Sequence, residues 1–400
     1  MQDLGRRHTL ALLVLAVMAA APAAGAPPEK PRARDLGIPF DGTPGPLNAI
    51  TDVAGVTVGH TTLISGSGKL QLGRGPVRTG VTAVLPRGPD SLMNPVFAAW
   101  FSQNGNGEMT GTAWVEESGF LEGPVMITNT HSVGVVRDAV IRWRVARAGP
   151  DATGFYWSLP VVAETWDGWL NDINGFHVTA EHAMQALDSA HAGRVEEGSV
   201  GGGTGMICNG YKGGIGSSSR RLEAKAGGYT IGVLVQCNYG TRDNLRIAGI
   251  PVGREIPAPE PYAFMPSDIA EHGSIIVVVA TDAPLLPHQL KRLGHRVTLG
   301  LGRNGSISGN ESGDIFLAFS TANSRAAAPA RVADLKMLPN DSMDPLFRAT
   351  VEATEEAIVN AMIGAEDMTG IDDHRVIALP HAALRAVLKK YGRLAAEASR

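Results

Sequence analysis

The chain has 400 residues, of which 44% are hydrophobic and 18% charged, and its formal net charge is −4 at pH 7. This length and apolar content suffice to bury one large core or two ordinary ones. The weakly acidic balance gives no general attraction to nucleic acid or to an anionic membrane, so we expect neither as a partner.

The first 26 residues have the composition of a secretory signal peptide. Arg6 and Arg7 form a short basic region, residues 9–20 form a mostly apolar run, and small residues then lead to an A-x-A sequence. The apolar run is too short to span a bilayer comfortably. We therefore expect residues 1–26 to be removed during export.

Export would place the mature chain, a single domain of residues 27–400, in the periplasm or outside the cell and free of the membrane. The sequence leaves the Sec or twin-arginine route open. A second A-x-A-like sequence at residues 21–23 competes as the cleavage site. An uncleaved membrane anchor is the alternative to a signal peptide.

Apolar periodicity predicts groups of strands and helices after an extended arm at residues 27–47. The predicted strands are 53–62, 80–86, 125–130, 228–238, 275–280 and 313–321. The predicted helices are 133–147, 179–191, 286–301, 344–363 and 381–394. Strands in groups flanked by helices, without strict βαβ alternation, favour a layered α+β sandwich over a Rossmann or barrel fold.

Several standard catalytic and binding motifs are absent from the sequence. It contains no G-x-S-x-G elbow, no H-E-x-x-H helix, no Walker A loop and no C-x-x-C pair. The glycine cluster at 200–205 lacks the lysine of a phosphate-binding loop, so we interpret it as close backbone packing or a wall of the substrate site. His131 is interpreted as a structural hydrogen-bonding residue. No metal is expected.

The chain has two cysteines, Cys208 and Cys237. One disulfide is possible in an exported protein. Both residues lie in apolar stretches, however, so two buried free thiols are an alternative of at least equal weight.

The segment HGSIIVVVATDAP at 272–284 places Gly273 and Ser274 directly before an apolar strand. Glycine permits backbone conformations that bring the Ser274 hydroxyl close to the preceding carbonyl. Attack there would form an ester, and its hydrolysis would leave Ser274 with a free α-amine. Such an amine has a pKa of about 7.7–8 and can act as general base for its own hydroxyl. Taken alone, the segment also fits an ordinary turn that enters a buried strand.

Seven blocks of the sequence, in order, resemble the L-aminopeptidase D-esterase/amidase (DmpA) family, which includes the β-peptidyl aminopeptidases. They are NGNGEMTGTAWVEESG at 104–119, PVMITNTHSVG at 124–134, PVVAETWDGWLNDING at 160–175, GGGTGMICNGYKGGIGSSSR at 201–220, GVLVQCNYG at 232–240, HGSIIVVVATDAPLLPHQLKRL at 272–293 and SGNESGDIFLAFSTAN at 308–323. The resemblance implies an αββα sandwich similar to N-terminal-nucleophile hydrolases. It also implies self-cleavage between Gly273 and Ser274, giving an α chain of residues 27–273 and a β chain of residues 274–400.

The resemblance further implies roles for three residues around the nucleophile. Asn238 matches an asparagine that donates to the oxyanion, a contact typically worth about 3–4 kcal/mol in a transition state. Ser312 and Asp314 match an S-G-[DE] motif expected to orient Ser274 and its amine. This chain has the shorter Asp where some members have Glu, which places the carboxylate of Asp314 nearer its own strand.

Three further residues match substrate-binding positions of the family. Glu164 matches a glutamate thought to receive the free amino group of the substrate, a role that needs a fixed anion. Trp157 and Trp166 match aromatic positions that line the pocket. The position of Trp166 is often Tyr in relatives, so the side-chain preference of relatives should not be copied to this chain.

The function implied is a serine aminopeptidase that releases N-terminal residues from small peptides, amides or esters through an acyl-enzyme on Ser274. No cofactor is expected, and the family implies a homo-oligomer. Specificity for β-amino acid residues is an alternative within this activity. An acyltransferase of the ornithine acetyltransferase type and a non-catalytic periplasmic binding protein are alternatives of other classes. Stereochemistry, residue preference and physiological substrate stay open.

Overall fold

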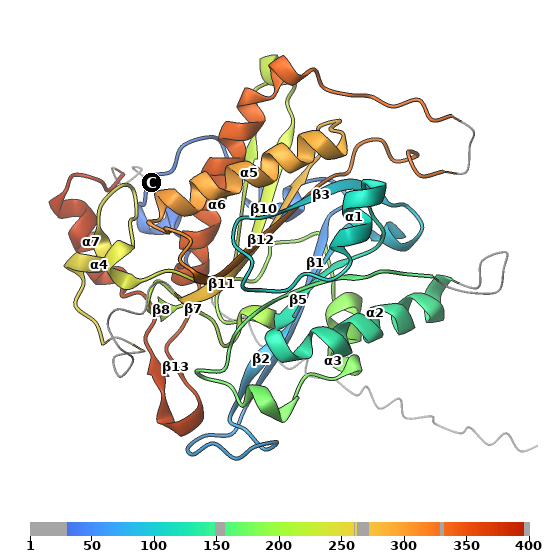
Figure 1. The fold of residues 1–400 in the computed structure, drawn as a ribbon. Helices are drawn as coiled ribbons and strands as arrows, with labels where there is room; N and C mark the ends of the chain where they lie inside the picture. The colour runs from blue at the N-terminus through green and yellow to red at the C-terminus, as the bar shows by residue number, and fades with distance from the viewer. Residues whose placement is uncertain (1–29, 149–156, 260, 262–271, 329–331, 396–400) are drawn as a thin grey trace, which may run out of the picture. The chain divides into compact units, whose positions relative to one another are not determined.

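The computed structural model describes residues 30–148, 157–259, 261, 272–328 and 332–395. The expected signal peptide therefore lies outside the described residues. The part of the chain from Pro31 onward forms one compact unit, which Figure 1 shows as a ribbon.

Two β-sheets form the centre of this unit. The four-stranded sheet has the order β1 (Thr57–Ser65), β2 (Val77–Pro89), β5 (Val125–Asn129) and β6 (Val161–Thr165). The six-stranded sheet has the order β4 (Phe120–Leu121), β3 (Val96–Ser102), β12 (Glu311–Ser320), β11 (His272–Thr281), β10 (Thr230–Asn238) and β9 (Gly214–Arg221). Neighbouring strands are antiparallel except for the pairs β5–β6 and β11–β12.

Helices cover the outer face of each sheet. Helices α2 (Val133–Ala148) and α3 (Ala180–Asp188) pack on the four-stranded sheet, and α5 (Pro287–Arg303) and α6 (Asp344–Ile363) pack on the six-stranded sheet (Figure 1). The remaining described α-helices are α1 (Thr112–Ser118), α4 (Val252–Glu255) and α7 (His381–Lys390). This order of layers confirms the expected αββα sandwich.

Strand β11 is buried on both faces, which explains its run of β-branched residues. Ile276 and Val278 belong to the apolar core between the two sheets, together with Ile127 of β5. Ile275 and Val277 point the other way, into the core beneath the helices. Alternation along the strand therefore decides which side chains face the inter-sheet space and which face the helices.

Strands β3, β6 and β9 were not predicted from the sequence. Strand β9 shows the reason, because Gly and Ser predominate in GIGSSSRR and it lacks apolar alternation. Its serines are nevertheless buried and hydrogen-bonded: the Ser217 hydroxyl donates to the Val233 carbonyl and the Ser218 hydroxyl to the Ala353 carbonyl. A side chain at Gly216 would lie 2.0 Å from the Ala357 carbonyl of α6, so glycine lets the helix pack directly on the strand.

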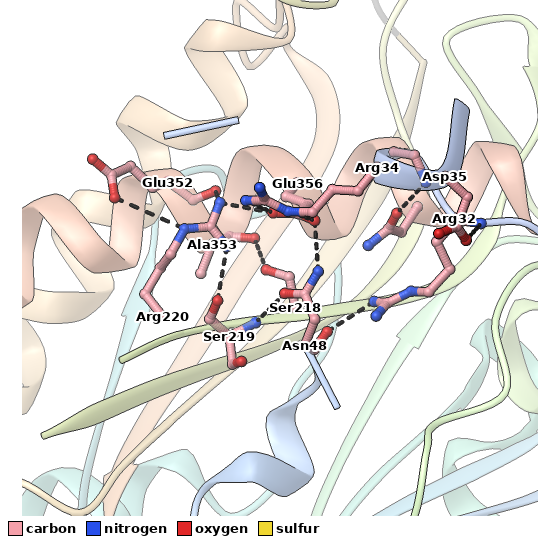
Figure 2. A network of polar contacts seen from close by, with 12 residues as sticks. Arg32, Arg34, Asp35, Asn48, Ser218, Ser219, Arg220, Glu352, Ala353 and Glu356 are labelled. Atoms are coloured by element: carbon pink, nitrogen blue, oxygen red, sulfur yellow. Dashed lines mark hydrogen bonds and ion pairs between the residues drawn. The ribbon is translucent and has the colours of Figure 1, made fainter. Parts of the chain in front are cut away.

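A buried ionic network fastens the N-terminal arm to α6 and β9 (Figure 2). The guanidinium of Arg220 pairs with Glu356 at 2.8 Å, and these side chains are 1% and 0% exposed. Arg34 also pairs with Glu356 at 2.8 Å, and the Asn48 amide donates to the same carboxylate at 2.6 Å. Burial acts to raise the pKa of Glu356, but the partners Arg34 and Arg220 outweigh it and lower the pKa.

Candidate active site

Gly273 and Ser274 lie inside β11 rather than in a turn before it. The strand runs between β10 and β12, and Ser274 is opposite Asn238 on one side and Gly313 on the other. Gly273 has φ +105°, and a side chain added there would lie 1.8 Å from the Asn238 carbonyl oxygen. Only glycine fits this backbone conformation and this space. The backbone directly before Ser274 is therefore held in a conformation that disfavours every residue except glycine.

The Ser274 side chain faces the space between the two sheets. It lies on the same face of β11 as Ile276 and Val278, and it is 6% exposed. Its hydroxyl oxygen accepts a hydrogen bond from the backbone N–H of Gly313 at 3.2 Å. The nucleophile predicted from the sequence is thus held by a neighbouring strand.

The Asn238 amide is oriented by two hydrogen bonds at the end of β10. Its Oδ1 accepts the N–H of Ile207 at 2.8 Å, and its Nδ2 donates to the carbonyl of Trp166 at 3.0 Å. A donor on one side and an acceptor on the other fix which atom is oxygen and which is nitrogen. An amide nitrogen carries two protons, so Nδ2 has a second proton to donate, and the oxyanion role of Asn238 stays a prediction.

Ser312 and Asp314 lie behind the nucleophile, on the opposite face of the six-stranded sheet. Both are fully buried, and the Ser312 hydroxyl donates to the Asp314 carboxylate at 2.6 Å. They alternate onto the same face as Phe316, which packs beneath the helices. The pair lies next to Gly273 and Ile275 in register, and its role in orienting the Ser274 amine stays a prediction.

Glu164 lies in β6 of the other sheet and is buried. Its carboxylate accepts the N–H of Glu108 at 2.9 Å and the hydroxyl of Thr130. Burial raises the pKa of Glu164, while these two hydrogen bonds and the charge of His131 act in the opposite direction. A carboxylate has about four acceptor positions, which leaves capacity for an ammonium group.

Gly107 connects Glu164 to the nucleophile. A side chain added at Gly107 would lie 3.3 Å from the Glu164 carboxylate and 3.3 Å from the Cα of Gly313, the residue opposite Ser274. Asn238 and Ser274 face the inter-sheet space, whereas Glu164 alternates along β6 with Ala163 of that core and lies beside Gly107 near the end of the strand. The fold brings together three residues that are 36 or more positions apart in the sequence.

The two tryptophans have different positions. Trp166 follows β6, is 40% exposed, and contributes its carbonyl to the Asn238 amide. Trp157 precedes β6, at the opposite end of the strand from Glu164, and packs edge-on against Trp114 with ring centroids 5.3 Å apart. The Trp166 carbonyl contacts the Asn238 amide, whereas the Trp157 ring contacts Trp114. The pocket role of Trp157 stays a prediction.

Some contributors to the site were not identified from the sequence. Thr130 binds Glu164, and Gly107 and Gly313 leave room between the sheets. A signal for Thr130 existed, since polar residues directly after an apolar strand often mark a functional edge. His131 is exposed and stacks on Phe176, with ring centroids 6.2 Å apart. The glycines at 201–203 are buried against the backbone of both sheets, as expected for close packing.

The structure joins Cys208 and Cys237 as a disulfide, with their Cα atoms 5.6 Å apart. Of the two alternatives left open by the sequence, it therefore has the disulfide. In the described part of the chain, no cluster of three or more His, Cys, Asp or Glu residues could hold a metal ion. None of the helices described is long and apolar enough to cross a bilayer.

Two sheets packed between helices, with a serine entering a central strand behind a glycine, define a hydrolase of the N-terminal-nucleophile type. The model of peptidase family S58 matches residues 48–376. The chain belongs to peptidase family S58 and is an aminopeptidase that acts on peptide-like substrates. The family expected from the seven sequence blocks is thereby confirmed.

The chain is similar to several characterised relatives over nearly its whole length. It is 56% identical over 393 residues to the beta-peptidyl aminopeptidase BapA of Sphingosinicella microcystinivorans, covering 96% of this chain and 98% of the relative. The BapA of Sphingosinicella xenopeptidilytica is 48% identical over 397 residues, covering 96% of each chain.

Two solved structures share the fold. The L-aminopeptidase D-Ala-esterase/amidase of Ochrobactrum anthropi is 52% identical with a TM-score of 0.85, covering 92% of this chain and 100% of the other; it is described as a prototype of the serine aminopeptidases with a variant of the Ntn hydrolase fold. A beta-aminopeptidase of a Burkholderia species is 48% identical with a TM-score of 0.82, covering 90% and 99% of the two chains.

Proposed function

We propose that the chain cleaves itself between Gly273 and Ser274 and then uses Ser274 to release N-terminal residues from small peptides, amides or esters. The observation that carries this proposal is the φ of +105° at Gly273, held against the Asn238 carbonyl directly before a buried serine. Membership of a peptidase family favours hydrolysis over the acetyltransferase and binding-protein alternatives.

In the self-cleavage step, the Ser274 hydroxyl attacks the Gly273 carbonyl carbon. The C–N bond breaks as the C–O bond forms, and the proton moves from the hydroxyl to the departing nitrogen. Water then hydrolyses the ester, leaving a Gly273 carboxylate and a free Ser274 amine. The remaining Asn238 amide proton stabilises the oxyanion at this step and in later turnover.

In the hydrolytic cycle, the Ser274 amine removes the proton from its own hydroxyl as that oxygen attacks the substrate carbonyl. The Ser312–Asp314 pair, on the face behind the strand, holds this amine in position. Glu164 pairs with the ammonium group of the substrate and so selects a free N-terminus. Water hydrolyses the acyl-enzyme and regenerates Ser274.

A Ser274→Ala variant tests both steps. We expect it to stay a single chain on a denaturing gel and to lose hydrolysis by at least about 10³-fold. Ser189→Ala, an exposed change at the end of α3, is the matched control and should be processed normally. Cleavage at 273/274 in Ser274→Ala would show that the nucleophile is misassigned.

We further propose that substrates with an N-terminal β-amino acid residue are accepted. The names of the two curated relatives and of the Burkholderia structure support this. The Ochrobactrum enzyme, named for L-residues and D-alanine esters, supports the α-amino acid alternative. Rates on L-, D- and β-aminoacyl p-nitroanilides distinguish them, and inactivity on every β-substrate would refute the proposal.

Export and assembly are separate proposals. A signal peptide at residues 1–26 is supported by its composition and by the disulfide, since disulfides persist in oxidising compartments. Cell fractionation with N-terminal sequencing of the α chain tests export. A homo-oligomer of αβ units is supported by the family resemblance, and native mass measurement tests it.

A further inference from the structure

A short hairpin packs against the end of β10, where Asn238 lies. It comprises β7 (Ile207–Cys208) and β8 (Tyr211–Lys212). Asn209 and Gly210 form its turn with φ of 49° and 70°. Two positive φ values are typical of a type I′ turn, which suits a two-residue hairpin loop.

Three consecutive residues of this hairpin are linked to three consecutive residues of the chain around the end of β10. Ile207 donates its N–H to the Asn238 side chain at 2.8 Å, and Asn209 donates its N–H to the carbonyl of Tyr239 at 2.7 Å. Between these two hydrogen bonds lies the covalent link from Cys208 to Cys237. The hairpin is thus anchored at the residue directly before the oxyanion donor.

The disulfide and the Asn238 amide lie on opposite faces of β10. Cys237 points into the core beneath the helices, while Asn238 alternates toward the inter-sheet space with Leu234. The disulfide therefore does not touch the substrate. It acts on Asn238 through the hairpin backbone, whose Ile207 N–H holds the amide oxygen.

The hairpin would be held less firmly without the covalent link. A two-stranded hairpin is only marginally stable alone, and this one is flanked by Gly205 and Gly213 and has Gly210 in its turn. A displacement of about 1 Å in a catalytic group can cost about 10²-fold in rate. The hydrogen bond from Ile207 would shift with the hairpin and turn the amide away from the oxyanion.

We propose that the Cys208–Cys237 disulfide is a positioning element of the active site, which holds the Asn238 amide in its oxyanion-binding orientation. This inference rests on the proposed function, because it requires Asn238 to act on the oxyanion of a Ser274 reaction. It assigns both cysteines a role in turnover beyond their contribution to stability.

The test is a double-mutant cycle on the processed enzyme. In the Cys208→Ala/Cys237→Ala variant we expect kcat per processed β chain to fall about tenfold and KM to stay within about twofold of the wild-type value. Complete loss of an oxyanion donor lowers kcat by about 10²–10³-fold, so a tenfold fall corresponds to partial loss. In an Asn238→Ala background, whose slower maturation is allowed for by counting only processed β chains, removing both cysteines should not lower kcat further. A purely structural disulfide would lower kcat equally in both backgrounds or leave it unchanged, and either result would overturn the inference.

Val233→Ala provides a matched control for general weakening of β10, since Val233 is fully buried in the middle of the strand. It should lower the melting temperature and leave kcat unchanged.

Mature wild-type enzyme, reduced with a phosphine and checked for two free thiols, gives a second measurement if the double variant fails to fold. We expect the same loss of kcat and its recovery on reoxidation. Full activity with two free thiols would refute the inference alone, whereas activity that survives in Ser274→Ala would refute the proposed function instead.

Discussion

At the scale of single residues, Gly273 carries the strongest constraint. Its φ of +105° is in the region that disfavours L side chains, and the Asn238 carbonyl occupies the position of a Cβ atom. The backbone conformation before Ser274 therefore requires glycine at position 273. The nucleophile depends on the residue before it as much as on its own hydroxyl.

We predict that Gly273→Ala blocks the maturation of the precursor. The substitution costs about 1–3 kcal/mol for the backbone conformation alone, and the contact with the Asn238 carbonyl adds to it. The accumulation of the 127-residue β chain (400 − 273) on a denaturing gel measures this. Gly302→Ala is the control, because nothing lies within 4 Å of the added atom there. Normal maturation of Gly273→Ala would contradict the proposed geometry.

We predict that the KM for substrates with a free amine rises as the pH falls through the pKa of Glu164. Burial raises that pKa, so the carboxylate takes up a proton at a higher pH than an ordinary glutamate and stops binding ammonium. The pH profile of KM measures this. Glu164→Gln should raise KM at least about tenfold at neutral pH and remove the acidic rise. An unchanged profile in that variant would exclude Glu164 as the amine site.

At the scale of elements, the N-terminal arm is fixed by buried charge as well as by apolar packing, since Ala33 and Ile38 also lie in the core. Arg220 and Glu356 are almost completely buried, so their attraction must offset a large desolvation cost. The arm, β9 and α6 share this network (Figure 2). It lies at the helix-covered face of the six-stranded sheet, away from the inter-sheet face that carries the nucleophile.

We predict that Glu356→Gln lowers the free energy of unfolding by about 3 kcal/mol without changing the kcat of the folded enzyme, because it leaves a buried guanidinium without its anion. Denaturant unfolding measures the loss. Asp138→Asn, which breaks an exposed pair with Arg142 on α2, should cost less than about 0.5 kcal/mol. A comparable loss in both variants would show that the network is no stronger than a surface pair.

At the scale of the whole molecule, the proposed cleavage between Gly273 and Ser274 would break the chain but leave the strands of the six-stranded sheet paired. The cut falls inside β11, and the part of this strand that begins the β chain lies between β10, from the α chain, and β12, from its own chain. The core between the sheets also draws on both chains. The two products should therefore remain one folded body.

We predict that the processed chains co-purify and unfold in a single cooperative transition. Their shared sheet and core must be lost together. Size exclusion followed by a denaturing gel, and calorimetry of the same sample, test this. Release of a separate β chain under native conditions would contradict the continuous sheet.

Local pattern determined those parts of the fold that neighbouring residues can specify. The β-branched run at 275–280 predicts a strand, and the structure has β11 there. The apolar period at 344–363 predicts a helix, and the structure has α6 there. The family and the nucleophile followed from ordered sequence blocks. A glycine directly before a serine is a local pattern, so the sequence can display it.

Tertiary structure decided what depends on contacts between distant segments. The serines of β9 form a buried strand only because the backbone carbonyls of β10 and α6 accept their hydroxyls. The faces of Ser274 and Ser312 depend on which side of the sheet the helices cover, and the pairing of the cysteines depends on the approach of a hairpin to β10. No local sequence pattern encodes these contacts, strand faces or cysteine pairing, because each is set by packing between elements far apart in the sequence.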